Sequence, residues 1–375
     1  MTFADELARI ERSNAAAIID SATPADVRRA LATERLTERD LAALLSPAAE
    51  QMLDEIGGRA RETTLRHFGR TIGLYAPLYL SNECDNECAY CGFSAANRVP
   101  RATLTDEQAV AEAEVLRDRG FRHVLLLTGE SPRALDEARL ARIVALLRPM
   151  FASVSIEVFP MAEDGYRTMV AAGVDGLTLY QETYDRATYA RLHRSGRKSD
   201  FDARLLAPGR GAAAGMRRVG IGCLLGLADF RRDIFCAALH AAWLSRRYWR
   251  THVTVSFPRL RHAEGGFAAA APVTDRQLAL AICATRIFLP RAGLVLSTRE
   301  TSALRDTLLP FGITQMSAGS CTRPGGYLHP EEVANEAQFS VEDHRTAEEV
   351  FAAIRSAGYD PAYKDWDAEL AGGAG

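Results

Sequence analysis

The chain has 375 residues, 47% hydrophobic and 25% charged, so it can bury a large core in one barrel-sized domain with additions. The formal net charge of −3 singles out no class of partner, and no basic run indicates a nucleic-acid-binding protein. No apolar stretch approaches the roughly 20 residues that a membrane helix needs, and the polar, acidic start lacks a signal-peptide pattern. We therefore expect a cytoplasmic protein that binds neither nucleic acid nor membrane.

Residues 1–70 alternate helical patterns with short breaks, which predicts an N-terminal helical extension. Helix starts are indicated by Thr23-Pro24, by a capping box between Thr37 and Asp40, and by Ser46-Pro47. No reactive side chains cluster in this segment, so its predicted role is packing.

From Leu74 onward, short aliphatic or β-branched runs alternate with helical patterns. The eight runs that predict strands are residues 74–80, 124–128, 154–159, 177–180, 219–225, 252–257, 294–297 and 313–316. Helices are predicted between them, for example at 106–119, 134–147, 232–249 and 274–288. Eight alternating units predict an α/β fold, a parallel (β/α)8 TIM-type barrel over residues 71–320, with an open doubly wound sheet as the alternative. Residues 321–375 are then a C-terminal extension that closes the barrel.

Three cysteines, Cys84, Cys88 and Cys91, fall within eight residues soon after the first predicted strand. Three thiolates can hold three irons of a [4Fe–4S] cluster and leave the fourth iron open to a small molecule, whereas a closed cluster takes four. A zinc site and a disulfide are the alternatives. The spacing fits a zinc site or a disulfide less well than it fits a cluster, because structural zinc normally uses paired ligands and the other four cysteines are scattered singly. Seven cysteines with this pattern fit a reducing cytosol.

The spacing Cys-x3-Cys-x2-Cys, with Tyr90 before the last cysteine, resembles the signature of radical S-adenosylmethionine (SAM) enzymes. Residues 76–82 before it and Gly92-Phe93-Ser94 after it resemble the tyrosine lyase of thiamine thiazole biosynthesis, 2-iminoacetate synthase. Further matches extend to near the C-terminus. The resemblance implies a barrel of the radical SAM kind with two cofactors, a [4Fe–4S] cluster on the three cysteines and SAM.

Polar groups at the ends of barrel strands are the candidates for binding SAM, because chemistry is placed at the C-terminal face of such barrels. By resemblance, Thr128-Gly129-Glu130 stands at the position of a glycine-rich edge that binds the methionine amino group of SAM. A plain strand-to-helix turn is the alternative. Glu182 and Arg204 resemble a pair that holds the ribose or amino group of SAM and its carboxylate, although Arg204 would also suit the surface of a charged helix. By resemblance, Gly226 belongs to a stretch that lines the adenine side of SAM, and a role in packing is the alternative for this glycine. The resemblance also places Tyr90 beside the cofactor.

The substrate candidate is Arg299, in the stretch Ser297-Thr298-Arg299-Glu300 at the end of the seventh predicted strand. A guanidinium there would pair with the carboxylate of an amino acid, and a structural ion pair with a neighbouring acid is the alternative. The resemblance adds Tyr90 and Ser317 as neighbours of the substrate, with Ser320 close to the second of these. It assigns no catalytic side chain, because the cofactor generates the radical.

The tail also resembles the thiazole-pathway enzyme, at Gln338-Phe339-Ser340, Asp343-His344-Arg345 and Lys364-Asp365-Trp366-Asp367. No cysteine follows Cys321 that could hold the second cluster of the related hydrogenase-maturation lyase. The resemblance implies cleavage of the Cα–Cβ bond of L-tyrosine to 2-iminoacetate and p-cresol, with 5'-deoxyadenosine and methionine. The implied partners are an electron donor such as flavodoxin or ferredoxin and a thiazole synthase subunit. A tryptophan lyase or another radical SAM enzyme on the same barrel, and a non-catalytic metal-binding scaffold, are the alternatives.

Overall fold

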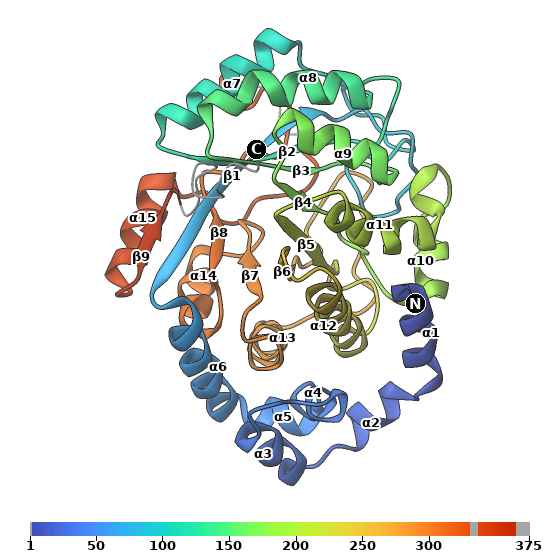
Figure 1. The fold of residues 1–375 in the computed structure, drawn as a ribbon, viewed down its shortest axis with the longest axis vertical. Coiled ribbons are helices and arrows are strands. Elements are labelled where there is room, and N and C mark those ends of the chain that lie inside the picture. Colours follow the sequence, from blue (N-terminus) through green and yellow to red (C-terminus); the bar gives the residue numbers. More distant parts are fainter. Residues whose placement is uncertain (1, 331–336, 365–375) are drawn as a thin grey trace.

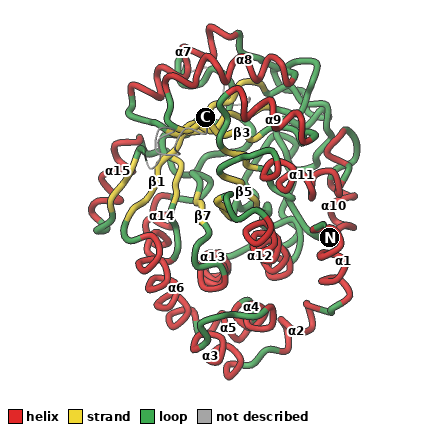
Figure 2. The backbone as a smooth tube through the Cα atoms, viewed as in Figure 1, coloured by secondary structure: helices red, strands yellow, loops and turns green. Residues whose placement is uncertain are grey.

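A closed barrel of eight parallel strands forms the centre of the computed structural model, which describes residues 2–330 and 337–364 (Figures 1 and 2). The barrel closes because β1 pairs with both β2 and β8, so the predicted (β/α)8 barrel is confirmed and an open sheet is excluded. The strands are β1 (Thr71–Ser81), β2 (His123–Thr128), β3 (Ser153–Glu157), β4 (Gly176–Thr178), β5 (Arg218–Gly222), β6 (His252–Ser256), β7 (Gly293–Leu296) and β8 (Gln315–Ser317).

Helices follow most of the strands and surround the barrel (Figure 2). They are α7 (Asp106–Asp118), α8 (Glu137–Leu147), α9 (Glu163–Ala172), α10 (Arg186–Leu192), α11 (Phe201–Ala213), α12 (Phe230–Arg247), α13 (Asp275–Phe288) and α14 (Ser302–Leu308), with single 3-10 turns at Arg148–Met150, Arg197–Ser199 and Leu309–Phe311. The predicted helix at 134–147 begins three residues later than expected, because Asp136 is its N-cap and accepts a hydrogen bond from the Arg139 amide.

Six helices precede the barrel and run in an arc beneath α12 and α13 (Figure 1). They are α1 (Phe3–Arg12), α2 (Ala15–Ser21), α3 (Pro24–Ala32), α4 (Glu38–Leu44), α5 (Pro47–Gln51) and α6 (Leu53–Phe68). The predicted caps Thr23, Thr37 and Ser46 are confirmed, each accepting a hydrogen bond from a backbone amide of its first turn. The arc is fastened at its start by Phe3, whose ring stacks on His240 of α12 at a centroid distance of 3.9 Å.

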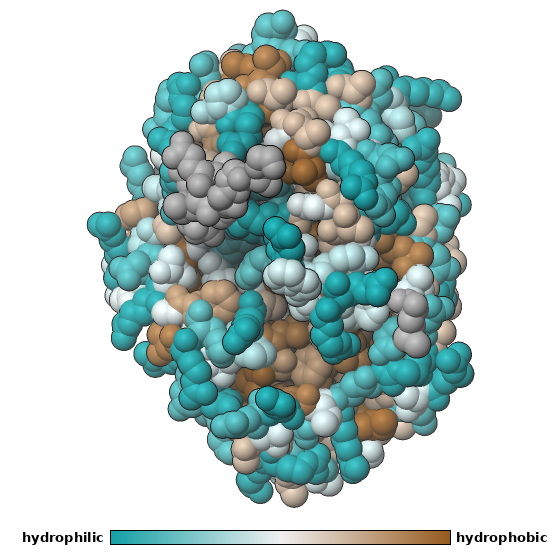
Figure 3. Space-filling view, viewed as in Figure 1, coloured by the Kyte–Doolittle hydropathy of each residue, from teal (hydrophilic) through white to brown (hydrophobic). Residues whose placement is uncertain are grey.

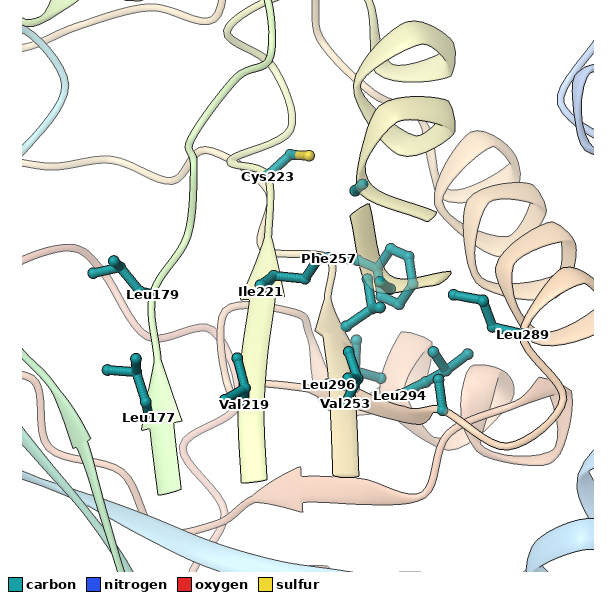
Figure 4. Close-up of a cluster of buried hydrophobic side chains, with 14 of the residues drawn as sticks. Leu177, Leu179, Val219, Ile221, Cys223, Val253, Phe257, Leu289, Leu294 and Leu296 are labelled. Atoms are coloured by element: carbon teal, nitrogen blue, oxygen red, sulfur yellow. The ribbon is translucent and has the colours of Figure 1, made fainter. Parts of the chain in front are cut away.

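Apolar side chains fill the layer between the strands and the helices. Leu177, Val219 and Val253 are direct register partners on β4, β5 and β6, and Figure 4 shows them in one buried cluster with Leu294 of β7. In Figure 3 apolar atoms also gather between the N-terminal arc and the barrel. Burial of this kind on the outside of the strands leaves the inward positions free to carry polar groups.

The C-terminal segment returns to the barrel and adds helix α15 (Ala347–Ser356) and strand β9 (Asp360–Ala362). The sequence analysis missed β9, which is only three residues long and pairs in parallel with Thr71–Gly73 at the start of β1. Within residues 2–330 and 337–364, no helix is long and apolar enough to cross a lipid bilayer. The division of the chain at residues 70 and 320 stays a prediction.

Candidate active site

The three predicted cluster ligands lie on the loop that follows β1, and this loop is tied down by its own side chains. Arg101 donates to the carbonyls of Asn82, Phe93 and Ser94 at 2.7, 2.9 and 2.8 Å. The loop is also joined to the end of α10, where the Ala89 amide donates to the Leu192 carbonyl at 3.0 Å. An arginine that bridges several carbonyls fixes a segment that has no regular secondary structure of its own.

All three cysteines are free thiols, with Cys88 buried and the other two half-buried. Side-chain amides point at two of the sulfurs: Asn86 Nδ2 is 3.7 Å from Cys84 Sγ, and Gln338 Nε2 is 3.9 Å from Cys91 Sγ. Amide donors of this kind stabilise thiolates that ligate iron, so the donor set fits a cluster. No group of three His, Cys, Asp or Glu side chains in the described part of the chain could hold a single metal ion. That finding bears on a mononuclear site, since a cluster places each cysteine on a different iron.

Gly129 lies where the end of β2 meets the cysteine loop. A Cβ atom on this residue would stand 2.1 Å from the carbonyl oxygen of Glu83 and 3.1 Å from Cβ of Cys84, so only glycine allows the two segments to touch. Its amide donates to the Ser81 carbonyl at 2.9 Å, and the hydroxyl of neighbouring Thr128 has no hydrogen-bond partner in the described residues. Glycine is therefore required at this position because the loop that carries the cysteines approaches so closely, which the sequence alone did not reveal.

Four charged side chains form one buried cluster beside this loop, which we call the charge cluster: Glu130, Glu182, Lys198 and Arg204. Arg204 Nη1 lies 2.9 Å from Glu130 Oε1, and Lys198 Nζ lies 2.6 Å from Glu182 Oε1. Arg204 Nη2 is also 3.4 Å from the same Glu182 oxygen. Arg204 is therefore not a surface residue of α11, because its side chain is only 6% exposed and it bridges both acids.

The electrostatics of the charge cluster keep Glu182 ionised. Burial acts to raise the pKa of its carboxyl, but the charges of Lys198 and Arg204 outweigh burial and lower the pKa to about 2. Its backbone also has φ of 71°, a left-handed conformation that is uncommon for a residue other than glycine. Such strain persists only where the surroundings hold the residue in place, as the two cations do here.

Sequence reasoning missed Lys198, although one signal was present. The chain has 45 basic residues and only two of them are lysines, Lys198 and Lys364. A lysine at this position, in a chain that otherwise uses arginine, marks the residue as a candidate for a specific role. Lys198 Nζ also lies 5.7 Å from the centroid of the Tyr90 ring.

Tyr90 adjoins the same region but has its hydroxyl engaged by a partner that the sequence did not suggest. Its hydroxyl oxygen is 2.8 Å from His193 Nε2, and His193 Nδ1 is 2.8 Å from the Tyr189 carbonyl oxygen. Burial, followed by the charge of Lys198, lowers the pKa of His193 to about 3, so the ring is neutral. The carbonyl requires the proton on Nδ1, and Nε2 therefore accepts from the Tyr90 hydroxyl.

The open end of the barrel holds a cavity that is partly open to solvent. Its wall includes Cys91, Tyr90, Glu182 and all the predicted substrate residues. Arg299 reaches the cavity with its guanidinium carbon 3.2 Å from the centroid of the Phe339 ring, and burial lowers its pKa. In the described residues it makes no ion pair, so the structural pairing considered as the alternative is not present.

Two serines after the last barrel strand also line the cavity. Ser317 Oγ accepts a hydrogen bond from the Thr298 amide at 3.1 Å, while the buried hydroxyl of Ser320 has no partner in the described residues. Gly226 lies four residues beyond β5 and outside the cavity lining, with φ of 113°. A Cβ there would meet Cβ of Leu260, which does line the cavity, at 3.3 Å.

Glu157, the last residue of β3, lines the cavity as well. Burial, reinforced by the negative charge of Glu182, raises the pKa of its carboxyl to about 7. The sequence placed this residue at a strand end but indicated no role for it.

The C-terminal segment lies across the cavity. Gln338 and Phe339 line it, the Glu342 amide donates to the Thr298 carbonyl at 3.0 Å, and buried Asp343 pairs with Arg305 of α14. Of the tail motifs noted in the sequence, residues 365–367 lie outside the described residues.

Comparisons with known proteins agree with this arrangement. The radical SAM superfamily matches residues 78–234, and the biotin and thiamin synthesis associated domain matches residues 256–360. The chain is 44% identical to the 2-iminoacetate synthase of Escherichia coli K12 and 42% identical to that of Salmonella typhimurium LT2, in each case over 98% of both chains. The crystal structure of HydG, a maturase of the [FeFe]-hydrogenase, superposes with a TM-score of 0.87 at 32% identity, covering 94% of this chain and 79% of HydG. Identity at this level along the whole length shows that the chain belongs to the 2-iminoacetate synthase family of the radical SAM superfamily.

Proposed function

We propose that this chain is a radical SAM lyase that cleaves the Cα–Cβ bond of L-tyrosine to 2-iminoacetate and p-cresol, with 5'-deoxyadenosine and methionine as the other products. The observation that carries the proposal is Arg299, a guanidinium inside the cavity with no ion-pair partner in the described residues. A cation held in this way lacks the carboxylate that would offset its burial, and an amino-acid substrate brings one. The family membership supports 2-iminoacetate as the product, for the thiazole moiety of thiamine.

The cofactors are a [4Fe–4S] cluster and SAM, as in the radical SAM superfamily. Cys84, Cys88 and Cys91 would hold the cluster, which together with bound SAM supplies the 5'-deoxyadenosyl radical that takes a hydrogen atom from the amino group of tyrosine. The chain contributes binding, orientation and the exclusion of water.

The charge cluster suits the amino-acid part of SAM, because it offers cations for a carboxylate and anions for an ammonium group. Arg204 would bind the carboxylate, and Glu130 and Glu182 would bind the amino or ribose groups. The Thr128 hydroxyl next to this cluster has no hydrogen-bond partner in the described residues, and Gly129 allows the cysteine loop to approach. Gly226 would belong to the segment on the adenine side of SAM.

On the substrate side, Arg299 would hold the tyrosine carboxylate with the help of the Ser317 hydroxyl. Tyr90 would contribute its ring, because its hydroxyl is already bound to His193. We further propose a cytoplasmic location and an electron donor such as flavodoxin or ferredoxin, since each turnover consumes two electrons, one to cleave SAM and one to reduce the fragment that becomes p-cresol. A thiazole synthase subunit is the proposed receiver of the imine, which water would otherwise hydrolyse.

The test is an anaerobic assay of the reconstituted protein with SAM, a reductant and L-tyrosine, in which 5'-deoxyadenosine and p-cresol are measured separately. Both products should form. 5'-Deoxyadenosine without p-cresol would remove tyrosine as the substrate, and L-tryptophan would be assayed next. An intact cluster that cleaves no SAM, or a metal analysis that finds zinc, would favour a metal-binding scaffold.

A further inference from the structure

Two charged side chains in the cavity lack a hydrogen-bonded or ionic partner among the described residues, Arg299 and Glu157. Among the other polar groups of the wall, Glu182 binds Lys198, and the Tyr79 hydroxyl donates to Gln338 at 2.7 Å. Glu157 is half-buried, and a carboxylate that faces a cavity without a partner is a candidate for binding a ligand there. The proposed function gives Arg299 a role and leaves Glu157 without one.

The two residues lie on opposite walls of the barrel. Glu157 ends β3 and Arg299 follows β7, and in the closed order of eight strands these two are four steps apart in either direction. The side chain of Glu157 faces the inside of the barrel. Its register partner on β2 is Leu127, whose own partner on β1 is Tyr79, and both of these residues line the cavity. Apolar side chains that include Leu125, Leu127, Leu224 and Val295 line the space with them.

We propose that Glu157 accepts the hydrogen bond, and during the reaction the proton, of the phenolic hydroxyl of the substrate while Arg299 holds its carboxylate. This inference rests on the proposed tyrosine lyase function. A molecule with a carboxylate at one end, an aromatic ring in the middle and a weakly acidic hydroxyl at the other end matches the order of cation, apolar wall and carboxylate across the cavity.

The proton transfer fits the bond changes of the cleavage. Loss of a hydrogen atom leaves an unpaired electron on the amino nitrogen, and the Cα–Cβ bond then divides its two electrons. One forms the C=N bond of 2-iminoacetate, and the other leaves on the benzylic carbon. If Glu157 takes the phenolic proton at this stage, the leaving fragment is a phenoxide with its unpaired electron spread over the ring. One electron from the donor and two protons, one returned by Glu157 and one from solvent, give p-cresol.

The surroundings of Glu157 give it the basicity that such a transfer needs. Burial and the negative charge of Glu182 raise the pKa of Glu157, whereas the positive charges of Arg299, Arg204 and Lys198 lower it. The charge of Glu157 in turn raises the pKa of three neighbouring tyrosines, Tyr75, Tyr79 and Tyr180. With a pKa of about 7 the carboxyl can both accept and return a proton near neutral pH.

The test separates SAM cleavage from bond cleavage in Glu157→Gln. This variant keeps the size and a hydrogen-bonding group but cannot take a proton, so 5'-deoxyadenosine formation from SAM and tyrosine should persist while p-cresol falls by about 100-fold, a typical loss of a general base. Ring-fluorinated tyrosines, whose phenols are more acidic, should recover much of the cleavage rate in Glu157→Gln, measured as the corresponding fluorinated cresol. The rate of p-cresol formation by the unaltered protein should fall as the pH drops through about 7, where Glu157 becomes protonated, and this inflection should be absent in Glu157→Gln.

Glu163→Gln is the matched control, because it makes the same substitution at a half-exposed residue of α9 outside the cavity lining, and it should behave as the unaltered protein. Glu157→Gln should unfold at the same temperature or higher, since a half-buried charge without a partner in the described residues is removed. If Glu157→Gln does not fold, Glu157→Asp keeps the carboxylate and should retain the pH inflection with a lower rate. A p-cresol loss that matches the 5'-deoxyadenosine loss and is not recovered by fluorination overturns the assignment. Absence of p-cresol from the unaltered protein would instead refute the proposed function.

Discussion

The residues assigned to the cofactor and those assigned to the substrate handle charge in opposite ways. On the cofactor side, the four residues of the charge cluster are paired with one another at 2.6–3.4 Å and are almost fully buried. On the substrate side, Glu157 from one wall of the cavity and Arg299 from the opposite wall lack such partners in the described residues. A paired site is preorganised and stable before its ligand arrives, whereas unpaired charges depend on the ligand to offset their burial. The comparison indicates that the cofactor side is built for rigidity and the substrate side for recognition.

Removing one thiol on the cofactor side should have the largest effect. Cys88→Ala leaves two cysteines in the loop, too few to hold three irons, so the reconstituted variant should lose the cluster and all formation of 5'-deoxyadenosine. Iron and sulfide analysis with the visible spectrum would check this. Cys283→Ala, a buried cysteine in α13, is the control and should keep its iron. Full iron content in Cys88→Ala would refute the ligand assignment.

Breaking a pair in the charge cluster should come next, and its readout is stability. Lys198→Met leaves Glu182 buried without its nearest cation, which should lower the free energy of unfolding by about 3–5 kcal/mol at pH 7. The folded pKa of Glu182 is about 2 and its ordinary value is 4.5, so the stabilisation is complete above 4.5 and is lost as the pH falls from there toward 2.

The difference between Lys198→Met and the unaltered protein should therefore shrink in acid, where the unpaired carboxyl of the variant becomes protonated. Denaturant unfolding of the metal-free protein at pH 7 and pH 3 measures it. Lys198→Arg keeps the charge and should lose less than Lys198→Met. Equal stability of Lys198→Met and the unaltered protein at pH 7 would show that the pair is not formed in solution.

On the substrate side, the same kind of change should affect binding and leave stability unaltered. Arg299→Lys keeps a positive charge but loses the planar fork that grips a carboxylate with two hydrogen bonds. A charged hydrogen bond contributes about 1.5–3 kcal/mol, so the KM for tyrosine should rise by about 10- to 100-fold. Titration of tyrosine in the 5'-deoxyadenosine assay gives the KM, and the affinity for SAM serves as the internal control. An unchanged KM for tyrosine would remove Arg299 from the substrate site.

The fold and the two anchor points of the site were predictable because each has a local signal. The barrel follows from eight strand-like runs at a regular alternation, the cluster ligands from three cysteines at fixed spacing, and Arg299 from its place after a strand. The charge cluster and the His193 contact were not predictable, since Tyr90 and His193 are 103 residues apart and meet only through the tertiary fold. Glu157 belongs to no sequence motif. Its proposed role follows only from the tertiary structure, in which it lacks a partner among the described residues and lies on the wall opposite Arg299.

Tyr90 tests the boundary between the two sides, and the smallest effect is expected there. The resemblance placed it beside both cofactor and substrate, while the structure commits its hydroxyl to neutral His193. Tyr90→Phe keeps the ring in the cavity wall and removes one hydrogen bond, so the free energy of unfolding should fall by about 1 kcal/mol while the KM for tyrosine stays within about twofold. Denaturant unfolding and the tyrosine titration measure the two quantities on one preparation. A tenfold rise in the KM with unchanged stability would mean that the hydroxyl turns from His193 to the substrate when tyrosine binds. The cofactor side would then not be fully preorganised, because one of its hydrogen bonds would be exchanged in every turnover.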